Sequence, residues 1–191
     1  MEKYQNKYRI KSHRKPNWDY SADAFYFLTI VTQNRECNLG SIVNYEMLLS
    51  DYGKIVETEW FKSFDIRDEL MLHEFVLMPN HLHAIVEIYN QNRGADPFAA
   101  RPSNPPVRLP KSISSFIAGF KSAVNTKIDD YIDENNDKGE RPLIATKYNR
   151  QNHFFQPNYH DHIIRNDFEY HNISNYIINN PAKWADDRFY G

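Results

Sequence analysis

The stretch that decides the fold of this chain reads Val76-Leu77-Met78-Pro79-Asn80-His81-Leu82-His83-Ala84-Ile85-Val86. Two apolar runs flank a Pro-Asn turn, so 70–77 and 83–89 are predicted to form an antiparallel pair of strands. Residues i and i+2 of a strand project from the same face. His81 and His83 should therefore point the same way, close enough to hold one metal ion or one phosphate. Leu82 should point into the opposite, packed face.

Further strand and helix patterns surround this pair. The aromatic and β-branched run 24–32 predicts a central strand. Ser50 is a candidate helix cap, and apolar residues at four-residue spacing behind it predict a helix over about 50–63. A second helix follows from an apolar stripe at helical period. The stripe comprises Ile113, Phe116, Ile117, Phe120, Val124 and Ile128.

The last third of the chain supplies one more strand and one more helix. Phe154-Phe155 is interpreted as the fourth strand. Asn166 followed by Glu169 resembles a capping box and predicts a third helix over about 167–180, which Pro181 ends. The order β-α-β-β-α-β-α predicts an α+β fold of the ferredoxin-like (RRM-like) type, an antiparallel sheet with helices on one face.

Length and composition limit the class of protein. The 191 residues suit a single domain over 1–191, and 13 Tyr and 12 Phe provide ample core. There is no apolar run long enough for a transmembrane span and no secretory signal core, so we expect no membrane association. The one cysteine, Cys37, can form no intrachain disulfide, which favours a reducing cytoplasm.

Charge and proline are unevenly distributed along the chain. The net charge is −2, yet residues 1–15 carry six basic side chains against one acidic side chain, so 1–20 is predicted to be a basic N-terminal arm. The arm is either a phosphate-binding segment or a soluble tail. Segment 91–110 holds five of the ten prolines and is interpreted as a loop within the domain.

A possible active site follows if the last helix crosses the sheet face that bears the histidines. Tyr176 and Asn180 are four residues apart and would share one face of that helix. Two imidazoles, an amide oxygen and a hydroxyl nucleophile would then converge. Such a set is poor for structural zinc and suits Mg²⁺ or Mn²⁺, with a phosphodiester supplying negative charge. A phenol with a pKa of about 10 needs the field of the metal or a nearby base before it can attack.

Spacing alone leaves the ligand set open. Tyr159-His160-Asp161-His162 is a second His-x-His sequence, and either His160 or His162 could supply a ligand or simply be a polar strand residue. A His-x-His pair by itself is more often incidental than metal-binding.

Several segments in order along the chain resemble the REP-associated tyrosine transposases, a branch of the single-tyrosine His-hydrophobe-His (HUH) superfamily. They are Tyr26-Phe27-Leu28-Thr29-Ile30-Val31-Thr32-Gln33-Asn34-Arg35-Glu36-Cys37, Met78-Pro79-Asn80-His81-Leu82-His83, Phe116-Ile117-Ala118-Gly119-Phe120-Lys121, His160-Asp161-His162-Ile163-Ile164-Arg165 and Tyr176-Ile177-Ile178-Asn179-Asn180-Pro181-Ala182-Lys183-Trp184. Met-Pro-Asn-His-x-His followed by Tyr-Ile-x-x-Asn-Pro is a specific combination. Segment 91–110 matches nothing in the family.

The resemblance implies a function and roles for these residues. It implies a metal-dependent endonuclease and transposase that cleaves and rejoins single-stranded DNA near hairpins of palindromic repeats. His81, His83 and Asn180 would hold Mg²⁺ or Mn²⁺, and Tyr176 would form a 5′-phosphotyrosine and release a 3′-OH. DNA contacts are expected from the basic arm, through Arg14 and Lys15, and from Lys121 and Arg165.

The same resemblance leaves other properties undecided. Related enzymes are homodimers that exchange the tyrosine helix or act as monomers, and a monomer is favoured here. The alternatives are a non-catalytic module that stacks single-stranded nucleic acid on an RRM-like sheet, and a metal-dependent hydrolase that uses water.

Overall fold

The structure is a computed structural model that describes residues 18–89, 110–137, 148 and 152–190. It also describes the backbone of two short strands that pair with each other, β1 (Lys3–Tyr4) and β2 (Lys7–Tyr8). Arg14, Lys15 and nearly all of the predicted loop 91–110 lie outside the described residues. No helix in the described ranges is long and apolar enough to span a bilayer.

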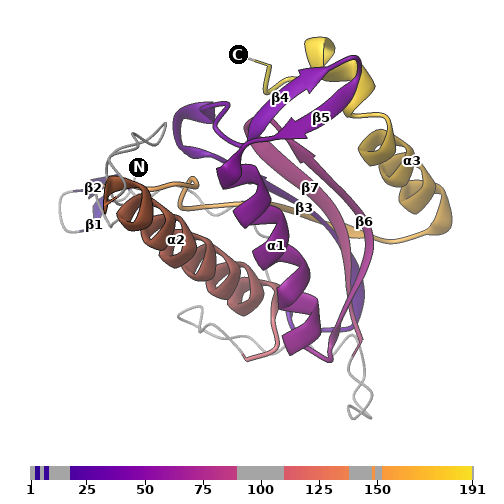
Figure 1. Cartoon of the computed structure of the whole chain (residues 1–191). Helices are drawn as coiled ribbons and strands as arrows, with labels where there is room; N and C mark the ends of the chain where they lie inside the picture. The colour runs from indigo at the N-terminus through magenta and orange to yellow at the C-terminus, as the bar shows by residue number, and fades with distance from the viewer. Residues whose placement is uncertain are drawn as a thin grey trace.

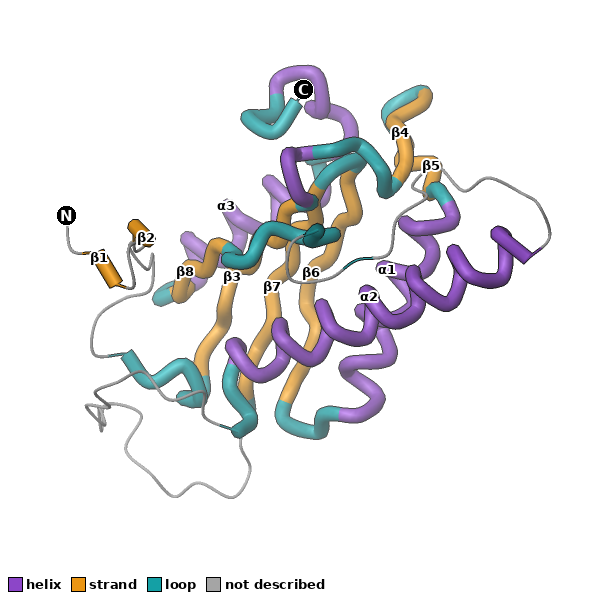
Figure 2. Tube along the Cα trace, turned by 90° about the vertical axis from the view of Figure 1, so that its left-hand side faces the viewer, coloured by secondary structure: helices purple, strands orange, loops and turns teal. Residues whose placement is uncertain are grey.

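A four-stranded antiparallel sheet forms the centre of the molecule, in the order β6-β7-β3-β8 (Figure 2). Its strands are β3 (Ala24–Val31), β6 (Leu70–Met78), β7 (His81–Ile88) and β8 (His160–Ile164). Strands β6 and β7 are joined by the Pro79-Asn80 turn, with Met78 opposite His81, which confirms the predicted antiparallel pair. Strand β7 is interior, because β6 and β3 bond to its two edges.

Helices cover both faces of this sheet (Figures 1 and 2). Helices α1 (Asp51–Ile66) and α2 (Ile113–Asp137) pack on one face, and α3 (Asp167–Ile178) packs on the other. The predicted α+β fold with an antiparallel sheet is confirmed, but the placement of all helices on one face is wrong for α3. The reason is that β3 and β7 are apolar on both faces. Leu28 and Leu82 face α1 and α2, whereas Phe27 and Ile85 need a second cover, which Ile177 of α3 supplies.

The core between the sheet and the first two helices is built around Trp60. Its fully buried ring lies 5.6 Å from that of Phe75 on β6, 5.1 Å from Phe116 and 5.0 Å from Phe120 on α2. The predicted apolar stripe of α2 is confirmed. The helix is longer than predicted, because Ile132 continues the stripe one turn beyond Ile128.

The fourth strand was predicted at the wrong place. Phe154 and Phe155 are buried in the core, and Phe155 forms only an isolated bridge with Thr32. Their backbone is bound to the end of β3, since Gln33 N donates to Phe154 O. Strand β8 follows them, so the aromatic residues that suggested a strand instead fill the core beside it.

An additional hairpin, β4 (Gly40–Val43) and β5 (Glu46–Leu49), lies between β3 and α1 and was not predicted. Its turn uses Asn44 and Tyr45 at positive φ (51° and 66°), the conformation of a two-residue hairpin loop. The observed strand order in the described residues therefore differs from the predicted one by this hairpin and by the short pair β1–β2.

Helices α1 and α3 begin at the predicted N-caps. Ser50 Oγ accepts from Gly53 N at 3.0 Å, and Asn166 Oδ1 accepts from Glu169 N at 2.8 Å. Helix α3 ends at Ile178, two residues before the predicted end, and Pro181 begins a short 3₁₀ helix, η2 (Pro181–Asp186). A shorter 3₁₀ turn, η1 (Gln33–Arg35), follows β3.

Candidate metal and tyrosine site

Two buried imidazoles on β7 form the centre of the site. His81 and His83 are fully buried on the face that α3 covers, with ring centroids 4.6 Å apart. Leu82 lies on the opposite face in the main core, as the alternation of a strand predicts. Backbone pairing on both edges of β7 fixes the two side chains relative to each other.

Each imidazole is held through its Nδ1 atom. His81 Nδ1 lies 2.9 Å from Asn80 Oδ1, and His83 Nδ1 lies 2.8 Å from Thr29 Oγ1. Among the described residues, His81 Nε2 has no hydrogen-bond partner although it is buried. Hydrogen bonding at one ring nitrogen with the other left available is the usual arrangement of metal-ligating histidine.

Burial keeps both rings neutral near neutral pH. It lowers the pKa of His81 to about 4, against the opposing effect of the Asp187 carboxylate. Burial, followed by the neighbouring His81, lowers the pKa of His83 well below its ordinary value. Neutral imidazole is the form that binds a metal, so metal binding requires no net loss of a proton from these rings.

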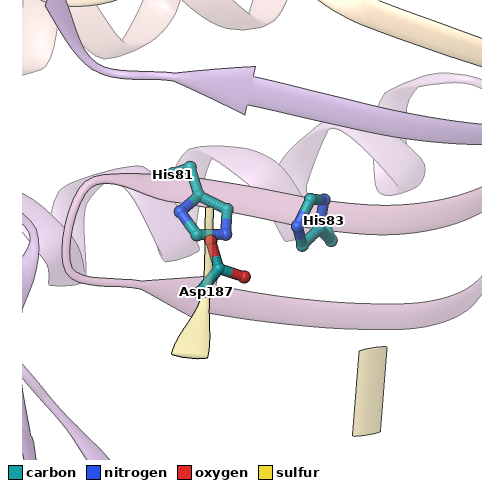
Figure 3. Close-up of side chains that lie close together, drawn as sticks. All are labelled: His81, His83 and Asp187. Atoms are coloured by element: carbon teal, nitrogen blue, oxygen red, sulfur yellow. The ribbon is translucent and has the colours of Figure 1, made fainter. Parts of the chain in front are cut away.

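A carboxylate completes a ligand group that the sequence analysis missed. The ligand atoms of His81, His83 and Asp187 all lie within 4.8 Å of one another. Figure 3 shows the Asp187 carboxylate beside the imidazoles, on the C-terminal segment that follows η2. Neither His160 nor His162 belongs to this group in the described part of the chain. The acidic pair Asp186-Asp187 was the available signal, but no sequence spacing relates it to β7.

Tyr176 reaches the same place from α3. Its hydroxyl oxygen lies 3.1 Å from His83 Nε2 and donates to Asp187 Oδ2 at 3.3 Å. The side chain is 41% exposed, so a substrate can reach it. Burial of part of the ring, and then the Asp187 carboxylate, raises the pKa of the phenol. The hydroxyl is therefore protonated at neutral pH and needs a base or a nearby cation to become a nucleophile.

Asn180 lies between α3 and η2, next to the same carboxylate. Its Nδ2 donates to Asp187 Oδ2 at 3.2 Å, and its buried Oδ1 has no partner among the described residues. Two buried acceptors, His81 Nε2 and Asn180 Oδ1, are thus unsatisfied at one site. A set of imidazole nitrogens, one carboxylate and an amide oxygen fits Mn²⁺ or Mg²⁺ with open coordination positions.

Polar contacts attach α3 to its own sheet. Ser174 Oγ donates to Glu74 Oε1 on β6 at 2.6 Å, and the Tyr170 hydroxyl lies 3.3 Å from His73 Nδ1. Ile177 is fully buried against the sheet. These contacts hold α3 against the sheet face that carries the histidine pair, where the Tyr176 hydroxyl lies 3.1 Å from His83 Nε2 of the same chain.

The predicted DNA-contact residues in the described ranges occupy different settings. Lys121 Nζ donates to the carbonyl oxygens of Gln156 (2.7 Å) and Asn158 (3.1 Å), and burial lowers its pKa to about 8. It holds the segment before β8. Arg165 is exposed at the end of β8. A DNA contact by either residue stays a prediction.

A cleft of about 760 Å³ adjoins the histidine pair. Thr29, the partner of His83, lies in its wall, and Arg35 and Arg188 contribute positive charge. The remaining lining comes mainly from 156–160. A smaller hollow of about 230 Å³ lies beside Tyr176, and its lining has mixed charge, from Lys183, Arg188, Asp186 and Asp187.

Solved structures define the class of this fold. A structure described as a REP-associated tyrosine transposase bound to a REP hairpin matches 92% of this chain and 74% of its own, with a TM-score of 0.55 and 19% identity. The resemblance read from the motifs is therefore confirmed at the level of the fold. A crystal structure from Deinococcus radiodurans covers 89% of this chain and 97% of its own at 15% identity, but its TM-score of 0.41 is too low to establish a common fold.

A sequence relative gives the family. No protein-family model matches the chain. An uncharacterized protein of Haemophilus influenzae is 33% identical over 183 residues, which are 94% of this chain and 92% of that protein. The chain belongs to the same family as this Haemophilus protein.

Proposed function

We propose that this protein is a metal-dependent transposase-type endonuclease that cleaves and rejoins single-stranded DNA next to hairpins. The observation that carries the proposal is the meeting of the Tyr176 hydroxyl with His83 Nε2 at 3.1 Å, beside the unsatisfied His81 Nε2. A nucleophile beside unsatisfied ligand atoms is the arrangement that phosphoryl transfer with a metal requires. Hairpin DNA is proposed because the fold neighbour was solved with a REP hairpin.

The reaction would transfer a phosphoryl group to the tyrosine. The Tyr176 oxygen bonds to the phosphorus as the bond from phosphorus to the 3′-oxygen breaks, giving a 5′-phosphotyrosine. The phenol proton passes to Asp187 Oδ2, which already accepts from that hydroxyl at 3.3 Å. The leaving 3′-oxygen takes a proton from water. Reversal with another 3′-OH rejoins strands without an external energy source, because the phosphodiester-type bond is retained.

The metal would be held by His81, His83 and Asp187, with Asn180 as a further ligand. When bound, Mg²⁺ or Mn²⁺ would supply Lewis-acid polarisation of the phosphoryl oxygens. The hollow beside Tyr176 offers Lys183 and Arg188 to the phosphate, and the larger cleft offers Arg35 to the strand that leads into it. The basic arm would add further phosphate contacts.

One chain would suffice for this chemistry, since Tyr176 reaches the histidines within the same chain. We therefore propose a monomer that acts in cis on DNA in the cytoplasm. The alternative of an RRM-like binding module requires an open sheet face, whereas α3 covers the face opposite α1 and α2. No observation favours that alternative.

The test is a labelled DNA hairpin with a single-stranded flank, incubated with Mn²⁺ and analysed on a denaturing gel. We expect a covalent protein–DNA adduct and a free 3′-OH fragment. Tyr176→Phe should abolish the adduct while hairpin binding persists, and the exposed control Tyr45→Phe should behave as the unmodified protein. Adduct formation by Tyr176→Phe would refute the tyrosine mechanism. Cleavage that survives this variant without an adduct would instead support water as the nucleophile.

A further inference from the structure

Asn80, in the turn between β6 and β7, is fully buried beside the metal-binding candidates. Its Nδ2 donates to the carbonyl oxygen of Arg35 at 3.0 Å and to that of Phe189 at 2.8 Å. Its Oδ1 lies 2.9 Å from His81 Nδ1. Two of these contacts join Asn80 to segments that are distant in sequence, and the third joins it to a histidine of the site.

These contacts fix which way the amide is turned. A side-chain amide nitrogen has two hydrogens, and both are used here on carbonyl oxygens, which can only accept. The reverse orientation would place the amide oxygen against two other oxygens. Oδ1 must therefore face His81, and an amide oxygen accepts but does not donate.

The orientation of Asn80 determines where His81 carries its proton. Because Oδ1 only accepts, Nδ1 must be the protonated nitrogen of the ring. A neutral imidazole has one N–H, so Nε2 keeps a lone pair. That atom is the one left buried without a partner among the described residues.

Two backbone segments supply the carbonyl groups that hold Asn80. Asn34 and Arg35 both adopt positive φ (56° and 59°) after β3, a conformation that is uncommon for residues other than glycine, although asparagine adopts it more readily than most. The Arg35 carbonyl that follows this turn reaches Asn80. The second carbonyl belongs to Phe189, two residues after Asp187. The backbone N–H of Phe189 donates to Asp187 Oδ1 at 2.7 Å.

We propose that Asn80 is a positioning residue that fixes His81 in its Nδ1–H tautomer and ties the segment carrying Asp187 to the same ring. The metal-related consequence rests on the proposed function, but the tautomer does not. Asn80 contacts neither substrate nor metal and acts only through His81 and the 187–189 segment.

The direct test is ¹⁵N NMR of the imidazoles in the metal-free full chain, assigned with a His81→Gln variant. We expect a protonated Nδ1 and an unprotonated Nε2 for His81. Asn80→Leu removes the acceptor and should shift His81 toward the Nε2–H form. Asn80→Asp retains an acceptor and should preserve the Nδ1–H form.

Binding of Mn²⁺ alone, measured by the electron paramagnetic resonance of free Mn²⁺, is the second readout. Asn80→Leu should weaken it by roughly 10- to 100-fold, the usual effect of losing a group that orients a ligand. Asn80→Asp keeps the acceptor for His81 but loses both bonds to the Arg35 and Phe189 carbonyl groups, so it should recover the affinity only in part. Asn135→Leu, a buried asparagine on α2, is the matched control and should have no effect.

A protonated Nε2 in the unmodified protein would overturn the proposal, and this readout holds even if Asn80→Leu does not fold. Unchanged Mn²⁺ affinity in a folded Asn80→Leu protein would overturn it too. If the unmodified protein shows the Nδ1–H form but binds no Mn²⁺, the proposed function fails while the role of Asn80 in setting the tautomer stands.

Discussion

Replacement of Asp187 by asparagine tests the site most sharply, because it removes a charge while nearly preserving shape. The substituted amide oxygen can still accept from Asn180 Nδ2, which now lies 3.2 Å from the carboxylate, whereas the amide nitrogen cannot accept from Phe189 N, so that one bond of 2.7 Å is lost. Asp187 is the only charged member of the proposed ligand group, since burial keeps both imidazoles neutral. The substitution should therefore change metal affinity with little change in folding.

The expected loss follows from the geometry. The ligand atoms lie within 4.8 Å of one another, so an ion between them is closer than that to the carboxylate. Opposite unit charges about 4 Å apart attract by about 4 kcal/mol at an effective dielectric constant near 20, and a divalent ion doubles this. Screening by water around the partly buried carboxylate, together with the hydration that the carboxylate loses on binding the ion, offsets more than half of this attraction. We expect a net loss of about 3 kcal/mol, or about two orders of magnitude in Kd.

The assay is Mn²⁺ titration of Asp187→Asn beside Asp186→Asn, which makes the same charge change one residue away and should leave the affinity nearly unchanged. The same substitution should also change the pKa of Tyr176. Because the Asp187 carboxylate raises the pKa of Tyr176, Asp187→Asn should lower that pKa in the metal-free protein, as followed by ¹³C NMR of labelled tyrosine. Equal Mn²⁺ affinities for the two variants would refute the assignment of Asp187 as a ligand.

Three further predictions concern stability and positioning. The pKa of His81 is about 4 in the fold. Below its unfolded value of about 6.5 the unfolded chain binds the extra proton, so His81 alone should lower stability by about 2 kcal/mol as pH falls from about 7 to 5, and His83, whose pKa is also lowered, should add to this loss. Urea titrations of the metal-free protein at both pH values would measure this loss of stability, and the loss should be smaller in His81→Gln. Trp60→Ala should lower the free energy of unfolding by about 3–5 kcal/mol, because a fully buried ring is removed. Ser174→Ala breaks the 2.6 Å bond to Glu74 and should slow adduct formation without changing hairpin affinity, as measured by fluorescence anisotropy.

Much of the fold could be predicted from the sequence because local patterns determine it. The Pro79-Asn80 turn between two apolar runs determined the β6–β7 pair, and Ser50 and Asn166 determined where helices begin. The errors arose where long-range packing decides. Phe154 and Phe155 have strand-like side chains, yet they fill the core and bond to the end of β3.

In the candidate site, too, the residues placed by local patterns could be predicted and those placed by long-range packing could not. Strand alternation was enough to place His81 and His83 together, and a helix crossing their face was enough to bring Tyr176 near them. Asp187 could not be predicted, because its position depends on a 3₁₀ turn that returns the chain to β7. Lys121 was expected to contact DNA, and its ammonium group is bound to backbone carbonyls, an arrangement that helical periodicity cannot reveal.

The interior position of β7 affects the order in which parts of the site open when the protein is heated. His81 and His83 belong to a strand bonded on both edges, whereas Asp187 follows a single 3₁₀ turn. Amide exchange should therefore be slowest at the histidines and much faster near Asp187. Warming the metal-free protein should release the carboxylate before the sheet melts, and a bound ion should delay that early loosening by linking the two parts.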